Sequence, residues 1–112
     1  MAEDSFDKLY ELSLLYDFYG ELLKENHKQI FEDYILNNFS LSEIAEERGI
    51  SRQGVHDSVK RTSQKLMEYE KKLGLLKKFQ ETKEKIEQIQ KLAKKYGVKQ
   101  IYQLSLEILE EL

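Results

Sequence analysis

The segment from residue 40 to 61, SLSEIAEERGISRQGVHDSVKR, constrains the fold more than any other part of this chain. Ser40 and Glu43 have the S-x-x-E spacing of a capping box, in which side chains satisfy two backbone N–H groups at the start of a helix. Gly49 can end that helix because glycine adopts positive φ at little cost. Ser51 can then cap a second helix. Two short helices joined by such a turn form a helix-turn-helix, whose second helix fits a nucleic-acid groove.

The rest of the chain is also predicted to be helical. The 112 residues include no proline and only five glycines, and no alternating Val/Ile/Thr run flanked by turn residues indicates a strand. The fold class is therefore predicted to be all-α. We expect helices from about Ser5 to Tyr19, from Asn26 to about Asn38, from Ser40 to Gly49, from Ser51 to Gly74, from Leu75 to Tyr96 and from about Lys99 to Leu112.

Apolar residues within the motif indicate which of its faces are buried. Ile50 follows the turn glycine and is expected to fill the corner between the two helices. The helix after Ser51 carries apolar residues at the three- and four-residue spacing of an amphipathic helix, namely Val55, Val59, Thr62, Leu66, Tyr69 and Leu73. The opposite side of that helix is polar and is expected to face solvent or a ligand.

The last third of the chain is predicted to form a helical hairpin. A heptad-like spacing joins Leu75, Phe79, Thr82, Ile86, Ile89, Ala93 and Tyr96. The final helix has one apolar side, formed by Ile101, Leu104, Ile108 and Leu112. We therefore expect a helix-turn-helix domain at residues 1–74 and a hairpin at residues 75–112. The hairpin packs either on the body of the same chain or on a second subunit, and a homodimer is as well supported as intramolecular packing.

Charge is distributed unevenly along the chain. The net charge is −3, but residues 1–47 have a balance of −9, residues 48–65 of +4 and residues 66–112 of +2. A protein that relies on bulk phosphate attraction is usually basic overall, so any nucleic-acid binding here is expected to be local. Asp57 is the single acid in the basic segment, where it would repel phosphate or could orient Arg61 four residues later.

The candidate nucleic-acid-binding residues lie in this basic segment. Arg52 and Gln53 occupy the first turn of the second helix, where arginine can pair with guanine and glutamine with adenine. Lys60 and Arg61 lie further along and are expected to meet phosphates, and His56 is a further polar contact residue. The alternative is an ordinary helical corner whose charged side chains are only solvated.

No catalytic, metal-binding or cofactor-binding residue is predicted. The chain has no cysteine, and its two histidines, His27 and His56, lack the spacing of a metal site. It has no phosphate-binding glycine loop, and its carboxylates are spread over helix surfaces without a marked pair for acid–base work. We expect a protein that is not an enzyme. No apolar run approaches the ~20 residues of a membrane span, so we expect a cytoplasmic protein with no membrane partner.

Three stretches carry a family resemblance. DFYGELL at 17–23, the helix-turn-helix segment at 40–61 and KLMEYEKKLGL at 65–75 together resemble the YlxM family of small bacterial proteins. The helix-turn-helix of that family is similar to region four of sigma factors. The resemblance covers the N-terminal two-thirds of the chain, and the last third matches mainly in helical character. It implies a sigma region-four-like helix-turn-helix bundle with a C-terminal helical extension.

The resemblance also implies a role for particular residues. It supports Ser51, Arg52 and Gln53 as the start of the recognition helix. The family usually has alanine and an aromatic residue where this chain has Gly54 and His56, and both departures lie on the presumed contact helix. No catalytic residues of the family exist to be carried over.

Two functions follow as expectations. The resemblance links the chain to the signal recognition particle pathway, because family genes adjoin those for the GTPase components of the particle. The first expectation is a regulatory or adaptor protein that binds DNA or the RNA of the particle through the recognition helix. The second is a protein-interaction module that binds a protein subunit of the particle through its acidic first half, without nucleic acid.

Overall fold

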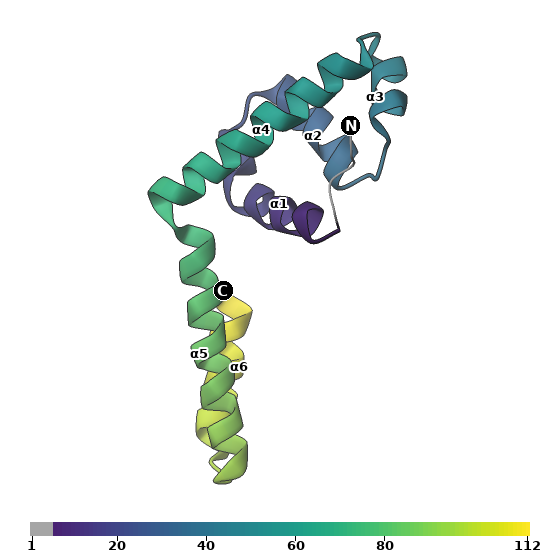
Figure 1. Ribbon diagram of the computed structural model, residues 1–112. Helices are drawn as coiled ribbons and strands as arrows, with labels where there is room; N and C mark the ends of the chain where they lie inside the picture. Colours follow the sequence, from purple (N-terminus) through teal and green to yellow (C-terminus); the bar gives the residue numbers. More distant parts are fainter. Residues whose placement is uncertain (1–5) are drawn as a thin grey trace. The chain divides into compact units, whose positions relative to one another are not determined.

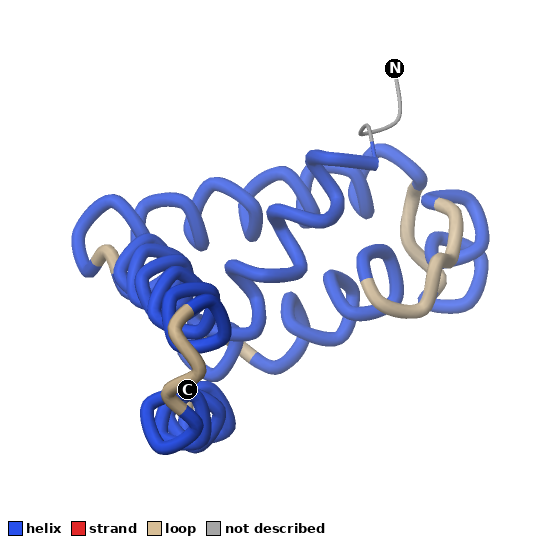
Figure 2. Tube along the Cα trace, turned by 90° about the horizontal axis from the view of Figure 1, so that it is seen from below, coloured by secondary structure: helices blue, strands red, loops and turns tan. Residues whose placement is uncertain are grey.

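The computed structural model describes residues 6–112, and every regular element within that range is helical (Figure 1). The helices are joined by short loops (Figure 2). They are α1 Phe6–Tyr19, the 3-10 turn η1 Gly20–Leu22, α2 Glu25–Ile35, α3 Leu41–Arg48, α4 Arg52–Leu73, α5 Leu75–Lys95 and α6 Lys99–Glu111. The predicted all-α class is confirmed. The predicted cap at Ser5 lies outside the described residues.

The chain divides into two compact units, the first ending at Leu73 and the second comprising Gly74–Leu112. In the first unit, α1, α2 and α3 each pack against α4, which is the central helix of the domain. In the second unit, α5 and α6 pack against each other as a helical hairpin. Gly74 takes a φ of 63° between α4 and α5, a conformation that glycine reaches without strain.

The core of the first unit is built from all four helices. Residues with almost no exposed surface are Leu12, Leu15, Tyr19, Phe31, Ile44, Val55 and Leu66. The ring of Phe31 packs against that of Tyr16, with centroids 5.6 Å apart. The predicted inward stripe of α4 is confirmed at Val55, Val59, Thr62 and Leu66, but Leu73 is 55% exposed at the end of the helix.

The tyrosines of α1 are mostly part of this core. Tyr16 and Tyr19 are buried, whereas Tyr10 is 60% exposed. Burial, and then a hydrogen bond that Tyr16 Oη donates to Glu32 Oε1, raise the pKa of the Tyr16 phenol above its usual range. The Tyr16 phenol therefore bonds as a neutral donor that joins α1 to α2.

The predicted start of α2 and the predicted position of Ile50 were wrong. Helix α2 begins at Glu25, with Lys24 and not Asn26 at the N-cap, and it ends at Ile35. Ile50 is 44% exposed, because its backbone N–H bonds the carbonyl of Ala45 and so holds it in the turn, while the fully buried Val55 of α4 packs into the core.

The hairpin buries only part of the predicted α5 seam. Ile86 and Ala93 of the α5 seam are buried as expected, but Ile89 and Tyr96 are 43% and 69% exposed. For the apolar side of α6, the sequence left open packing within the chain and packing on a second copy; in the structure α6 buries the small Ser105 and that side is largely exposed. An apolar surface of the hairpin is therefore left between 45% and 58% exposed at Ile101, Leu104, Ile108 and Leu112.

Candidate nucleic-acid interface

The turn between α3 and α4 has the local geometry that the sequence predicted. Ser40 Oγ accepts a hydrogen bond from the Glu43 N–H at 3.0 Å, and the Glu43 carboxylate accepts one from the Ser40 N–H at 3.1 Å. Gly49 has a φ of 66° and ends α3. Ser51 Oγ accepts a hydrogen bond from the Gly54 N–H at 2.9 Å, which caps α4. The direction of α4 is thus fixed by local bonds at both sides of the turn.

Four of the five predicted contact residues share one side of α4. An α-helix turns about 100° per residue, so Arg52, Gln53, His56 and Lys60 fall within an arc of about 100°. Arg52, Gln53 and Lys60 are exposed, whereas His56 is half-buried. We call these four residues the α4 contact face. Arg61 lies about 100° further round the helix from Lys60, on the other flank.

Two side chains of the α4 contact face are tied to Asp57. Gln53 Nε2 donates a hydrogen bond to Asp57 Oδ1 at 2.9 Å, so Asp57 is bonded to Gln53 and no bond to Arg61 is found among the described residues. His56 Nδ1 lies 3.5 Å from the same carboxylate oxygen and has no hydrogen-bond partner in residues 6–112. That nitrogen is closed off from solvent, so a ligand could reach it only if the side chain moved.

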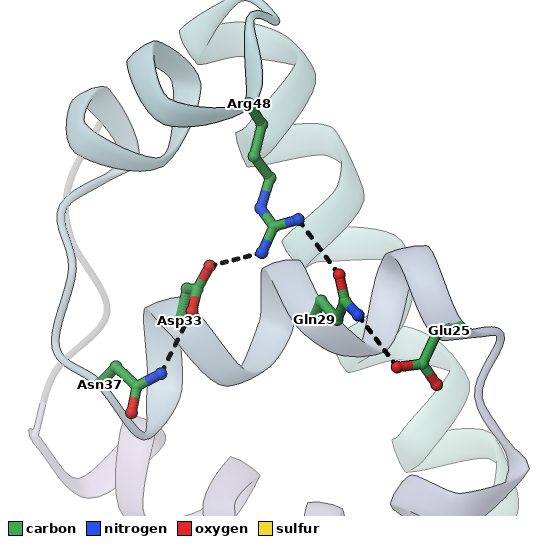
Figure 3. Close-up of polar contacts among 5 residues, drawn as sticks. All are labelled: Glu25, Gln29, Asp33, Asn37 and Arg48. Atoms are coloured by element: carbon green, nitrogen blue, oxygen red, sulfur yellow. Dashed lines mark hydrogen bonds and ion pairs between the residues drawn. The ribbon is translucent and has the colours of Figure 1, made fainter.

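Arg48 belongs to the basic segment but has a structural position. Its Nη2 donates to Asp33 Oδ2 at 2.7 Å and its Nη1 to Gln29 Oε1 at 3.4 Å, so it joins the end of α3 to α2 (Figure 3). Gln29 in turn donates to Glu25, and Asn37 donates to the other oxygen of Asp33 (Figure 3). Arg48 is therefore engaged within the chain and fixes the helix that precedes the turn.

We expect Arg48→Gln to destabilise the domain by about 1–3 kcal/mol, because it leaves the mostly buried Asp33 carboxylate without its charged donor. The partial exposure of both side chains keeps the loss below that of a fully buried pair. Urea unfolding of Arg48→Gln, Asp33→Asn and the double variant measures it. Additive losses would show that the two side chains do not interact.

Acidic side chains cover α3 next to this interface. Glu43, Glu46 and Glu47 line a shallow hollow together with Phe39, and all three carboxylates belong to exposed residues. They precede the α4 contact face by only a few residues. A polyanion that approaches α4 therefore meets like charge on one side, which favours local over extended contact.

Arg61 instead lies with residues that the sequence reasoning did not group. Arg61 lines a pocket together with Leu23, Lys24, His27, Thr62 and Lys65. Lys24 and His27 are more than thirty positions from Arg61, so no local spacing could have indicated this grouping. It arises because α2 packs against α4.

Neither a metal site nor a membrane span is found in residues 6–112. No three His, Cys, Asp or Glu side chains in this range gather closely enough to hold a metal ion. None of its helices is long and apolar enough to cross a bilayer.

Several bacterial proteins similar to this chain carry the name of one family. A profile of the family described as "UPF0122: Putative helix-turn-helix protein, YlxM / p13 like" matches residues 6–107. UPF0122 protein TTE1463 of Caldanaerobacter subterraneus is 54% identical over 83 residues, which cover 74% of this chain and 71% of that protein. UPF0122 protein YlxM of Bacillus subtilis is 48% identical over 89 residues, covering 80% of this chain and 81% of that protein.

A third relative extends the match to the C-terminal hairpin. UPF0122 protein BH2485 of Halalkalibacterium halodurans is 42% identical over 106 residues, which cover 95% of this chain and 97% of that protein. Both units of the structure therefore fall within the region shared with BH2485 and matched by the family profile. The chain belongs to the UPF0122 family of YlxM- and p13-like bacterial proteins.

Proposed function

We propose that this protein is a non-enzymatic regulator or adaptor that binds nucleic acid through the α4 contact face. One observation carries the proposal. The side chains of Arg52 and Lys60 are exposed on the first half of α4 and form no hydrogen bond or ion pair with other described residues. Two cations on a rigid helix that have no partner within the chain can bind a polyanion with little loss of backbone conformational entropy.

The chemistry of the face suits short, local contacts. In duplex DNA, Arg52 can bond guanine in the major groove. Gln53 can bond adenine there after its hydrogen bond to Asp57 is broken. The major groove of A-form RNA is too deep and narrow for a helix, so RNA would be bound through phosphates or an irregular loop. The resemblance to YlxM proteins makes the RNA of the signal recognition particle, and DNA near the genes for its GTPase components, the first ligands to test.

The experiment is a titration of labelled particle RNA and of labelled duplex DNA, followed by fluorescence anisotropy at several salt concentrations. We expect the logarithm of the association constant to fall with the logarithm of salt concentration with a slope of about −2 or steeper, because Arg52 and Lys60 of the α4 contact face each contribute about −0.9 and any further phosphate contact adds to the slope. A supporting result is saturable binding with such a slope. Absence of saturable binding to both ligands at low salt would contradict the proposal.

A specific observation favours a second function, binding of a basic protein. The hollow on α3 is lined by Phe39 and three glutamates, and it belongs to the acidic first part of the chain. A protein subunit of the signal recognition particle with a basic surface would meet complementary charge there. Capture of that subunit should survive nuclease treatment and Arg52→Ala, but fail in Glu46→Lys with Glu47→Lys. Capture that is lost on nuclease treatment would exclude this function.

The hairpin supports a proposal about oligomeric state, in which two copies of the chain pair through α5 and α6. Beside the exposed apolar side of α6, one end of the hairpin is basic, with Lys91, Lys94, Lys95 and Lys99, and the end of α6 is acidic, with Glu107, Glu110 and Glu111. A two-fold axis across the hairpin sets the glutamates of α6 in one copy against the basic end of the other, while Lys77 and Lys78 at the start of α5 add positive charge near those glutamates.

We expect the full chain to be a dimer in light scattering and Leu104→Gln with Ile108→Gln to be a monomer, since both leucine and isoleucine lie on the exposed apolar side. Leu36→Gln, at a residue 51% exposed in the first unit, is the matched control and should remain dimeric. A monomeric wild-type chain would refute pairing.

A further inference from the structure

A pocket outside the α4 contact face gathers basic side chains. It lies between the start of α2 and the side of α4 that carries Arg61, and it has a volume of about 170 Å³. Its lining residues are Leu23, Lys24, His27, Arg61, Thr62 and Lys65. A single water needs about 10–15 Å³ of such space, so the pocket can admit a tetrahedral anion with some of its water. Three of the lining side chains carry a full positive charge.

No carboxylate neutralises this cluster in the described part of the chain. Lys24, Arg61 and Lys65 form no hydrogen bond or ion pair there through their side chains. The two acids nearest to Lys24 in sequence are engaged elsewhere, since Glu21 accepts a bond from Lys28 at 3.1 Å and Glu25 accepts one from Gln29 at 3.1 Å. Like charges gathered without a counterion repel one another, and an anion in the pocket would remove that repulsion.

Two further polar side chains, those of Thr62 and His27, line the pocket. His27 Nδ1 lies 3.1 Å from Ser58 Oγ, which orients the imidazole ring. Lys24 is the N-cap of α2 and provides no side-chain bond to the first helical turn. The positive end of the α2 dipole therefore lies beside the three cations without a side-chain cap.

We propose that this pocket binds a phosphate group, held by Arg61 and Lys65 from α4 and by Lys24 from the start of α2. A phosphate matches these donors because guanidinium can bond two of its oxygens and ammonium groups neutralise its charge. The group belongs either to the backbone of a nucleic acid on α4 or to a free phosphate compound. Only the first source rests on the function proposed above.

The first arm of the test uses the full chain and inorganic phosphate or pyrophosphate. Amide NMR shifts should saturate around Lys24, His27 and Arg61, and Lys24→Gln with Lys65→Gln should weaken binding by about tenfold or more, as expected for lost charge-assisted bonds. Lys85→Gln, at an exposed lysine of α5, is the matched control. Lys24 and Lys65 are exposed, so replacing them should leave the core intact. Thermal unfolding of each variant checks that the fold is retained.

The second arm measures nucleic-acid binding of the same variants. If the backbone supplies the phosphate, the Lys24→Gln and Lys65→Gln variant should bind more weakly, with a salt slope shallower by about 1 to 2. If a free phosphate compound is the ligand, nucleic-acid affinity stays unchanged while pyrophosphate binding is lost.

A third variant separates this proposal from the proposed function. Arg52→Glu with Lys60→Glu should retain pyrophosphate binding in the pocket, even if it loses nucleic acid. The proposal is overturned if neither phosphate nor pyrophosphate gives saturable shifts and the pocket variant binds nucleic acid like the wild type. It is also overturned if Lys85→Gln weakens phosphate binding as much as the pocket variant does, since that would indicate unspecific attraction to lysines.

Discussion

Arg52→Glu combined with Lys60→Glu is expected to lower the affinity for nucleic acid by about a hundredfold or more. Each substitution removes a charge-assisted contact and places a carboxylate against phosphate, and each substitution contributes a factor of at least about ten. Both side chains are exposed and have no partner among the described residues, so the fold should be unaffected. Anisotropy titrations with the RNA and duplex probes measure the change.

The control for this variant has the same change of charge elsewhere. Lys83→Glu with Lys85→Glu alters two exposed lysines of α5 and should change affinity far less. If both double variants lose affinity equally, the loss reflects total charge and the α4 contact face has no particular role. An unchanged dissociation constant for Arg52→Glu with Lys60→Glu would refute binding through α4.

Phe31→Ala is expected to destabilise the domain by about 3–5 kcal/mol, the usual cost of a large aromatic cavity in a core. Phe31 has no exposed surface, and its ring packs against that of Tyr16. Small domains are stable by only about 5–15 kcal/mol, so this variant should be partly unfolded or have a much lower unfolding midpoint. Urea unfolding followed by circular dichroism measures the loss.

Ile50→Ala is the informative comparison, because hydrophobicity alone would rank Ile50 as a core residue. Its side chain is 44% exposed, so we expect a loss below about 1 kcal/mol. Equal losses for the two substitutions would show that Ile50 is buried in solution and that the packing of the turn differs from the structure.

Local patterns in the sequence were sufficient for the helices and the turn. The capping box of Ser40 and Glu43, the positive φ of Gly49 and the cap at Ser51 all involve residues within four positions of one another. Hydrogen bonds of this range depend little on the rest of the chain, so their residue types predict them well. The error at Asn26 shows the limit, because several residues can cap a helix and local preference alone does not choose among them.

Packing between distant segments could not be derived in the same way. The sequence left open whether the apolar side of α6 packs within the chain or on a second copy, and in the structure that side is exposed while α6 buries Ser105. An amphipathic pattern shows which side of a helix is apolar but does not specify whether the partner is the same chain or another one. The exposed apolar surface of the hairpin was found only in the structure.

The sequence by itself determined an all-α chain, the helix-turn-helix geometry and the outward position of Arg52, Gln53 and Lys60 on α4, because helix periodicity and capping act over a few residues. Only the tertiary structure decided that Arg48 is engaged with Asp33 and that Arg61 and Lys65 share a pocket with Lys24 and His27. These groupings depend on how α2 and α3 pack against α4, and such contacts join residues far apart in the chain.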